Sequence, residues 1–202
     1  MRVGREPAAR AGLKLLGEVG LEGLTLRAIA GELGVQAPTL YWRFRNKQDL
    51  IDEMASQVLA DHAAGLAAAP PAGSWPEAAH QSGQRLRAEL MRYRDGALMV
   101  AGALRHDPAI HAAVATTLEV FTAADVAPAD ARACLETIHS YVIGFAVERQ
   151  AVSDPPKEDD VRFDRGLRLI VAGFAAGLPL GGKAWIDFRS WRTPLMISDN
   201  IP

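Results

Sequence analysis

The stretch that decides the fold is TLRAIAGELGVQAPTLYWRFRNKQD, residues 25–49. Apolar residues recur at helical spacing up to Gly34 and again from Leu40 to Phe44. This spacing predicts two short helices joined by a tight turn, the second running through Phe44. Such a pair is the pattern of a helix-turn-helix.

Local signals mark where these helices begin and end. Thr25 is a predicted N-cap whose hydroxyl accepts a bond from a free amide, and Gly34 suits the left-handed conformation that commonly ends a helix. Pro38 suits a first helical position, because its missing N–H costs no bond there. A further helix begins after Asn46, a predicted N-cap, with Asp49 at the favourable end of the helix dipole.

The outer face of the second helix is the predicted functional surface. Leu40 and Phe44 fall on one side and pack inward, which leaves Tyr41 and Trp42 outside. Exposed aromatic residues on so short a helix need a partner, and DNA supplies one: Arg and Gln read base edges, while hydroxyls and amides bond phosphates. The predicted DNA-binding residues are Thr25, Arg27, Gln36, Ala37, Pro38, Thr39, Tyr41, Trp42, Arg43 and Lys47. Among these, the candidates for base contacts are Arg27, Gln36 and Arg43. An ordinary helical hairpin with Tyr41 and Trp42 in its core is the alternative.

Composition agrees with a helical DNA-binding protein. A chain of 202 residues with 49% hydrophobic residues can bury a proper core. Abundant Ala and Leu, without alternating β-branched stretches, predict an all-α fold. Residues 1–50 carry eight Lys or Arg against five Asp or Glu, a surplus of +3, within a chain of net charge −2. The basic end is therefore the DNA-facing end.

Cysteine usage and hydropathy indicate the compartment. Cys134 is the only cysteine, so no internal disulfide forms, and a small core residue in a reducing cytoplasm is expected. The first ten residues lack the apolar region of a secretory signal. The uncharged stretch 169–182 is shorter than a membrane span and contains Pro179. We expect a cytoplasmic protein.

Helical periodicity continues along the chain. The expected helices are residues 7–20, the two helices of the helix-turn-helix, 47–67, 75–94, 96–105, 108–124, 128–151 and 160–178. In the first of these, the stripe expected to cover the helix-turn-helix is Ala9, Leu13, Leu16 and Val19. The long helix 47–67 links a DNA-binding head to a helical body.

Several segments carry a resemblance to a known family. APTLYWRFRNKQDL at residues 37–50 resembles the second helix and following turn of TetR-family repressors. SWPEAA at 74–79, LMRYRDGA at 90–97 and GFAVERQ at 144–150 are similar to the core domain of the family's tetracycline-binding members. The resemblance reaches roughly Gly182. It implies a homodimeric repressor, released from a palindromic operator by a small molecule that shifts the linking helix.

The resemblance also implies a division of the chain. Residues 1–46 would form the DNA-binding domain, residues 47–182 would bind the effector and dimerise, and the tail 183–202 does not look like the family. Its last two long helices would pair with those of a twin. The apolar stripes expected there are Leu135, Ile138, Val142, Phe145 and Ala146, then Leu167, Ile170, Val171 and Phe174. The alternative is that both stripes face the chain's own core.

The effector chemistry of the family is only partly present. Its drug-binding histidine aligns with Ala63, next to His62, its pocket asparagine with Ser82 and its magnesium-binding histidine with Val100. One acidic residue persists as Glu148, and a single glutamate builds no magnesium site, so we expect no metal or cofactor. An effector other than tetracycline, or a different pose, is implied. The predicted ligand-binding residues are His62, Leu86, Leu90, Val100, Leu104, Thr117, Phe121, His139, Val142 and Glu148, any of which could instead be plain core.

The sequence bears on two other classes of function. An enzyme is not expected, because the histidines, including His106 and His111, show no metal-ligand spacing and no nucleophile or phosphate-loop motif occurs. A helical small-molecule-binding module without sequence-specific DNA binding is the closer competitor. It predicts the same body but no salt-dependent binding to duplex DNA.

Overall fold

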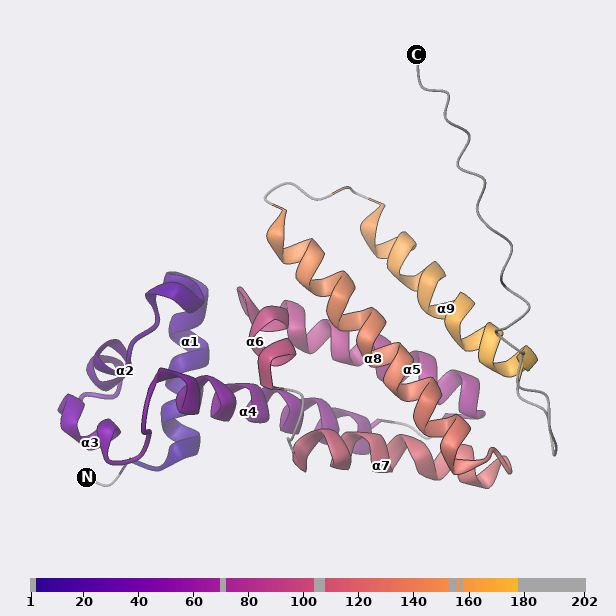
Figure 1. The fold of residues 1–202 in the computed structure, drawn as a ribbon, viewed down its shortest axis with the longest axis horizontal. Helices are drawn as coiled ribbons and strands as arrows, with labels where there is room; N and C mark the ends of the chain where they lie inside the picture. The colour runs from indigo at the N-terminus through magenta and orange to yellow at the C-terminus, as the bar shows by residue number, and fades with distance from the viewer. Residues whose placement is uncertain (1–2, 70–71, 104–107, 153–155, 157, 178–202) are drawn as a thin grey trace, which may run out of the picture.

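The structure is a computed structural model that describes residues 3–69, 72–103, 108–152, 156 and 158–177. Every regular element in these ranges is an α-helix, which confirms the all-α prediction. The helices are α1 (Arg5–Gly23), α2 (Leu26–Glu32), α3 (Ala37–Tyr41), α4 (Lys47–Ala67), α5 (Trp75–Met91), α6 (Gly96–Ala103), α7 (Pro108–Ala123), α8 (Pro128–Ala151) and α9 (Asp159–Gly177). Figure 1 shows α1 to α3 gathered as a head, with α4 running from it into a body made of α5 to α9. The tail, 183–202, lies outside the described residues.

Side-chain caps fix several helix starts. The Thr25 hydroxyl accepts a hydrogen bond from the Ala28 amide at 3.1 Å, and the Asn46 side chain accepts one from the Asp49 amide at 2.8 Å. Both predicted N-caps are therefore confirmed. Because a cap satisfies amides that have no partner within the helix, Asn46 sets the start of α4 at Lys47.

The helix-turn-helix is present, with a shorter second helix than predicted. Gly34 has φ +65°, the left-handed conformation expected after α2. Helix α3 ends at Tyr41, because the Arg43 amide bonds the Leu40 carbonyl at 2.8 Å in a tighter turn, and the predicted extension through Phe44 is wrong. Pro38 is the second helical residue rather than the first.

The head has its own apolar core, and α4 contributes to it. The Ile29, Leu40, Phe44, Leu50 and Met54 side chains are fully buried. A Cβ placed on Gly12 would lie 2.7 Å from the Met54 sulfur, so α1 and α4 meet closely there. Burial of these side chains removes apolar surface from water, which is the main force that holds α1 to α4 together.

Helix α1 is broken near its end. Gly20 has φ +66°, outside the helical region, and the two parts of α1 meet at this kink. The predicted stripe is confirmed for Ala9, Leu13 and Leu16, which are buried. The inclusion of Val19 is wrong, since it is 39% exposed, and it lies directly before the kink, where helical periodicity ceases to describe the chain.

The break in α1 is where head and body are joined by a hydrogen bond. The Leu21 amide donates to the Asp95 carboxylate at 2.9 Å, and Asp95 lies in the turn between α5 and α6 with φ +58°. Gln150 of α8 holds the same turn from the other side. Its side chain accepts from the Ala97 amide at 3.0 Å and donates to the Leu90 and Tyr93 carbonyls at 3.0 and 2.9 Å. The bond to Leu21 thus rests on a turn that is fixed within the body.

The body places α8 between neighbouring helices. A Cβ on Gly83 of α5 would lie 3.0 Å from Ile138 of α8 and 2.9 Å from Leu167 of α9, so the three helices meet there. In Figure 1, α8 and α9 lie side by side. The stripe on α8 is buried within the chain, as are Leu167 and Val171 of α9. These buried residues are covered by helices of the same chain, so the interpretation of them as the surface that meets a twin is wrong. Ile170 and Phe174 of the α9 stripe are only half-buried.

The only cysteine and the polarity of the helices both agree with the sequence. Cys134 is fully buried, as predicted, and burial raises the pKa of its thiol to about 12. A thiol with so high a pKa is a poor nucleophile at neutral pH. In the described ranges, the helices are all too short or too polar to span a bilayer.

Candidate functional site

The outer face of α3 carries two exposed aromatic residues. Tyr41 is 60% exposed, and Trp42, directly after the helix, is 89% exposed. Leu40, on the inner side of α3, is fully buried. The alternative in which both aromatics belong to the core of a hairpin is therefore wrong. A tryptophan with nearly all its surface in water is uncommon in proteins and marks a surface that meets a partner.

The structure brings the predicted DNA-binding residues to the α2–α3 end of the head. Seven of them are exposed: Thr25, Arg27, Gln36, Pro38, Tyr41, Trp42 and Arg43. Ala37, Thr39 and Lys47 are half-buried. The Lys47 ammonium donates to the Glu22 carbonyl at 3.1 Å, so it also ties α4 to the end of α1. Its remaining protons are free to bond a phosphate.

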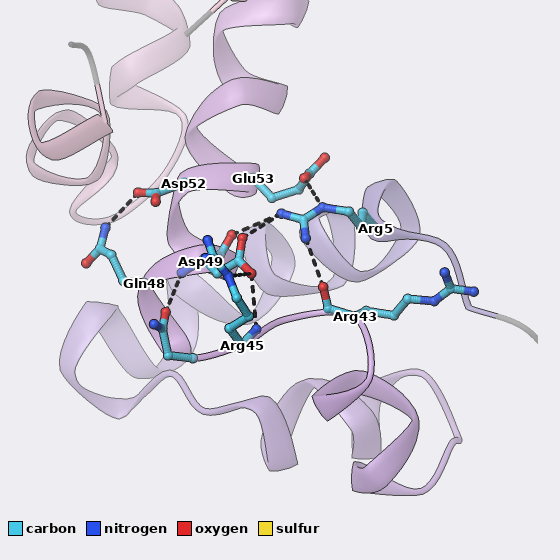
Figure 2. Close-up of polar contacts among 8 residues, drawn as sticks. Arg5, Arg43, Arg45, Gln48, Asp49, Asp52 and Glu53 are labelled. Carbon is cyan, nitrogen blue, oxygen red and sulfur yellow. Dashed lines mark hydrogen bonds and ion pairs between the residues drawn. The ribbon is translucent and has the colours of Figure 1, made fainter. Parts of the chain in front are cut away.

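Sequence analysis missed a cluster centred on Arg5, which Figure 2 shows at the start of α1. Its guanidinium donates to Glu53 at 2.5 Å, to Asp49 at 2.9 Å and to the Arg43 carbonyl at 2.8 Å. It also lies over the Phe44 ring, 4.6 Å from the centroid. Because these partners are about 40 to 50 residues away along the chain, no local sequence pattern predicts these contacts.

Asp49 in this cluster is ionised at neutral pH. The hydrogen bond from Arg5, helped by one from the Arg45 amide, lowers the pKa of Asp49 to about 2. Since the Asp49 side chain is only 14% exposed, its interactions are less screened than those of a surface pair. The junction between α3 and α4 is thus fixed by charge-assisted bonds.

The predicted effector residues gather in the body. His62 from α4, Leu86 and Leu90 from α5, Val100 from α6, Thr117 and Phe121 from α7, and Val142 from α8 are all buried. Leu104 lies outside the described residues. Glu148 is exposed and so differs from the buried set. The buried residues come from five helices. A hydrophobic core and a ligand-binding site both have this arrangement.

Two histidines meet in this region. The His62 and His139 rings face each other edge to face, with centroids 6.5 Å apart. Burial lowers the pKa of each to about 4, and in His62 the nearby His139 and Arg85 lower it further. Both rings are therefore neutral at pH 7. Within the described part of the chain, neither ring nitrogen of His62 has a hydrogen-bond partner.

The histidines of the body do not belong to a metal site in the described part of the chain. No group of three or more His, Cys, Asp or Glu side chains close enough to hold a metal ion occurs among the residues that the structure describes. His106 lies outside them, and the side chain of His111 is not described. Neutral imidazoles in apolar surroundings instead offer one donor and one acceptor each to an organic ligand.

A helix-turn-helix that exposes aromatic and basic side chains, joined by a long helix to an all-helical body, defines a class of helical DNA-binding regulators. Comparison with known proteins gives the family. Residues 9–54 match the family described as bacterial regulatory proteins, tetR family, and residues 67–162 match the tetracyclin repressor-like C-terminal domain. The chain belongs to the TetR family of transcriptional regulators.

Individual relatives agree. The tetracycline repressor protein class D of Escherichia coli is 35% identical over 164 residues, which cover 79% of this chain and 74% of the relative. A TetR variant from Acinetobacter baumannii AYE, solved in complex with minocycline, has a TM-score of 0.77 at 31% identity, covering 88% of this chain and 99% of that one. BioQ, solved with its double-stranded DNA operator, has a TM-score of 0.69 at 32% identity, covering 86% and 99%.

Proposed function

We propose that the protein is a homodimeric repressor that binds a palindromic DNA operator and is released by a small molecule. The observation that carries this is Trp42, 89% exposed beside Tyr41 on a head that is otherwise well packed. Residues 1–46 serve as the DNA-binding domain and residues 47–182 as the effector and dimerisation domain. The protein works in the cytoplasm, and no catalytic activity is proposed.

The head reads DNA through α3 and the turn that follows it. Arg27, Gln36 and Arg43 are exposed and long enough to reach base edges in a major groove. The residues that position the head on the phosphate backbone and set its register are Thr39, Tyr41, Trp42 and Lys47. BioQ, which has a similar fold and was solved with its operator, supports DNA binding as the function of this chain.

A palindromic site requires a two-fold dimer, and α8 and α9 are the helices proposed to form its interface. The faces that remain outside the chain's own core carry exposed apolar residues. Val161 and Leu169 of α9 are 71% and 65% exposed, and Val152 at the end of α8 is 49% exposed. Burial of such side chains against a twin is the simplest way to remove them from water.

The effector acts through α4. His62 lies on this helix, which continues into the head, so a ligand that bonds the His62 ring reaches the element that carries the DNA-binding face. The complex of the A. baumannii relative with minocycline supports a small-molecule site in such a body. A ligand that prefers one α4 orientation by roughly 1 to 3 kcal/mol changes operator affinity by about 5- to 150-fold.

The test is selection of bound duplexes from a random DNA pool, followed by titration of the winner at two salt concentrations. A palindromic winner bound by two chains, as measured by sedimentation, is the expected outcome. The winning duplex then serves as the probe in a screen for molecules that release it. An absence of enrichment would favour a helical small-molecule-binding module without sequence-specific DNA binding.

Two single substitutions separate base contacts from phosphate contacts. Arg43→Ala should relax specificity at one base pair, with a loss of about 1 to 3 kcal/mol for the operator only. Lys47→Ala should weaken binding to operator and random duplex alike and reduce the salt slope by about one. Titrations of both variants on both duplexes check this. Unchanged operator binding in both variants would mean that the α3 turn is not the DNA-binding face.

A further inference from the structure

Arg5 connects three parts of the head that are distant in sequence. It lies in the first turn of α1, yet its hydrogen-bond partners lie in the turn after α3 and in the first two turns of α4. Figure 2 shows the guanidinium between these two segments. Its Nε, Nη1 and Nη2 atoms each have an acceptor within the protein.

One of these bonds holds the backbone of a proposed base-reading residue. The Arg5 Nη1 donates to the carbonyl of Arg43 at 2.8 Å, while the Arg43 side chain is exposed and points away from the cluster in Figure 2. The guanidinium also lies over Phe44, the next residue, which is fully buried. Arg5 therefore holds the backbone from which the Arg43 side chain projects, at the Arg43 carbonyl and at the next residue.

The other bonds hold the start of α4. Asp49 and Glu53 are one turn apart on α4, and Arg5 bonds both carboxylates. The Asp49 carboxylate also accepts a hydrogen bond from the Arg45 amide at 3.1 Å, so the segment that joins α3 to α4 is itself bonded to α4. A planar guanidinium can reach several acceptors in fixed directions at once, which a lysine cannot.

We infer that Arg5 is a positioning residue for DNA recognition: it fixes Arg43 relative to α4 and acts on operator choice through Arg43, without contacting DNA itself. This inference rests on the proposed function. A small displacement of a base-reading side chain weakens its contact, whereas the phosphate contacts of other residues persist. Arg5 should therefore affect discrimination between sequences more than overall affinity for duplex DNA.

The experiment compares Arg5→Ala with Arg10→Ala. Arg10 is also on α1 and forms an ion pair with α4, to Asp61 at 2.6 and 2.9 Å, but contacts nothing in the α3 turn in the described structure. Both variants lose one positive charge and the ion pairing of that arginine with α4. Affinity is measured for the selected operator and for a scrambled duplex at several salt concentrations, after thermal melts have established that each variant is folded.

The expected result is specific to Arg5. Arg5→Ala should lower the operator-to-scrambled affinity ratio by roughly 10-fold, within the range of a lost bidentate base contact, with an unchanged salt slope. Arg10→Ala should leave the ratio unchanged. The double variant Arg5→Ala/Arg43→Ala should discriminate no worse than Arg43→Ala alone, since both substitutions remove the same contact.

Other outcomes overturn the inference. Equal losses on both duplexes with a slope lower by about one would make Arg5 a phosphate contact. Equal effects of the two single variants would make it an ordinary structural link. If Arg5→Ala does not fold, Arg5→Lys, which keeps the charge but not the fork, must lower the ratio instead. Failure of the wild-type protein to bind any selected duplex would refute the proposed function itself, a result distinct from all of these.

Discussion

Lowering the pH from 7 to 4 should remove several kcal/mol of folding stability, because the buried His62 and the half-buried His139 are neutral rings in the folded protein. Each has a folded-state pKa of about 4 against an ordinary value of 6.5. As the pH falls through 6.5 the unfolded chain takes up protons that the folded chain does not, so the unfolded state gains stability. The loss builds up between pH 6.5 and 4 and reaches on the order of 3 kcal/mol per histidine.

This loss of stability is a large part of the usual free energy of unfolding of a protein, which is about 5 to 15 kcal/mol. Urea unfolding at pH 7, 5.5 and 4.5, at fixed protein concentration, measures it. His62→Leu should show about half the acid-dependent loss of the wild-type protein, whatever its stability at pH 7. An identical pH dependence in wild type and His62→Leu would mean that the buried ring is not what the acid titrates.

Gly96→Ala should destabilise the protein by about 3 kcal/mol, a large effect for the addition of one methyl group. A Cβ at this position would lie 2.5 Å from the Leu90 carbonyl oxygen and 3.3 Å from the Tyr93 side chain. The first contact is with backbone, which cannot move aside as a flexible side chain can. Relief of the clash must open the α5–α6 turn that Gln150 holds.

The matched control is Gly17→Ala on α1. Apart from its chain neighbours and the backbone of its own helix, no atom of the described residues lies within 4 Å of a Cβ at Gly17. The substitution should therefore stabilise the helix by about 0.5 to 1 kcal/mol. Urea unfolding of both variants gives the comparison. Since Asp95 is next to Gly96 and holds the Leu21 amide, Gly96→Ala should also alter operator affinity. Equal stabilities of the two variants would show that the turn yields easily.

Much of the fold follows from local sequence signals. The start of α4 follows from the Asn46 cap and the start of α8 from Pro128, because caps and prolines act within a few residues. The end of α3 was missed because a tighter turn replaced its last predicted residues. The predicted first helix ends at Gly20, where the structure has the break in α1, and only the continuation to Gly23 was not predicted.

The candidate site, too, was predictable from the sequence only in part. Exposure of Tyr41 and Trp42 was predicted, because periodicity places them opposite Leu40 and Phe44. Periodicity also found the buried stripe of α8, but it could not tell whether the same chain or a twin covers it. The Arg5 cluster is a meeting of segments that only tertiary packing brings together.

The packing of Leu50 and Met54 into the head has a practical meaning for hybrid repressors. A chimera that joined a foreign head at residue 46 would replace Gly12 and Ile29 yet retain the α4 side chains shaped to fit them. It would also separate Arg5 from Asp49 and Glu53. A graft made beyond Val58 keeps each transplanted head with its own complement of α4 side chains. Exchange of DNA specificity between members of this family therefore requires transfer of the first turns of α4 as well.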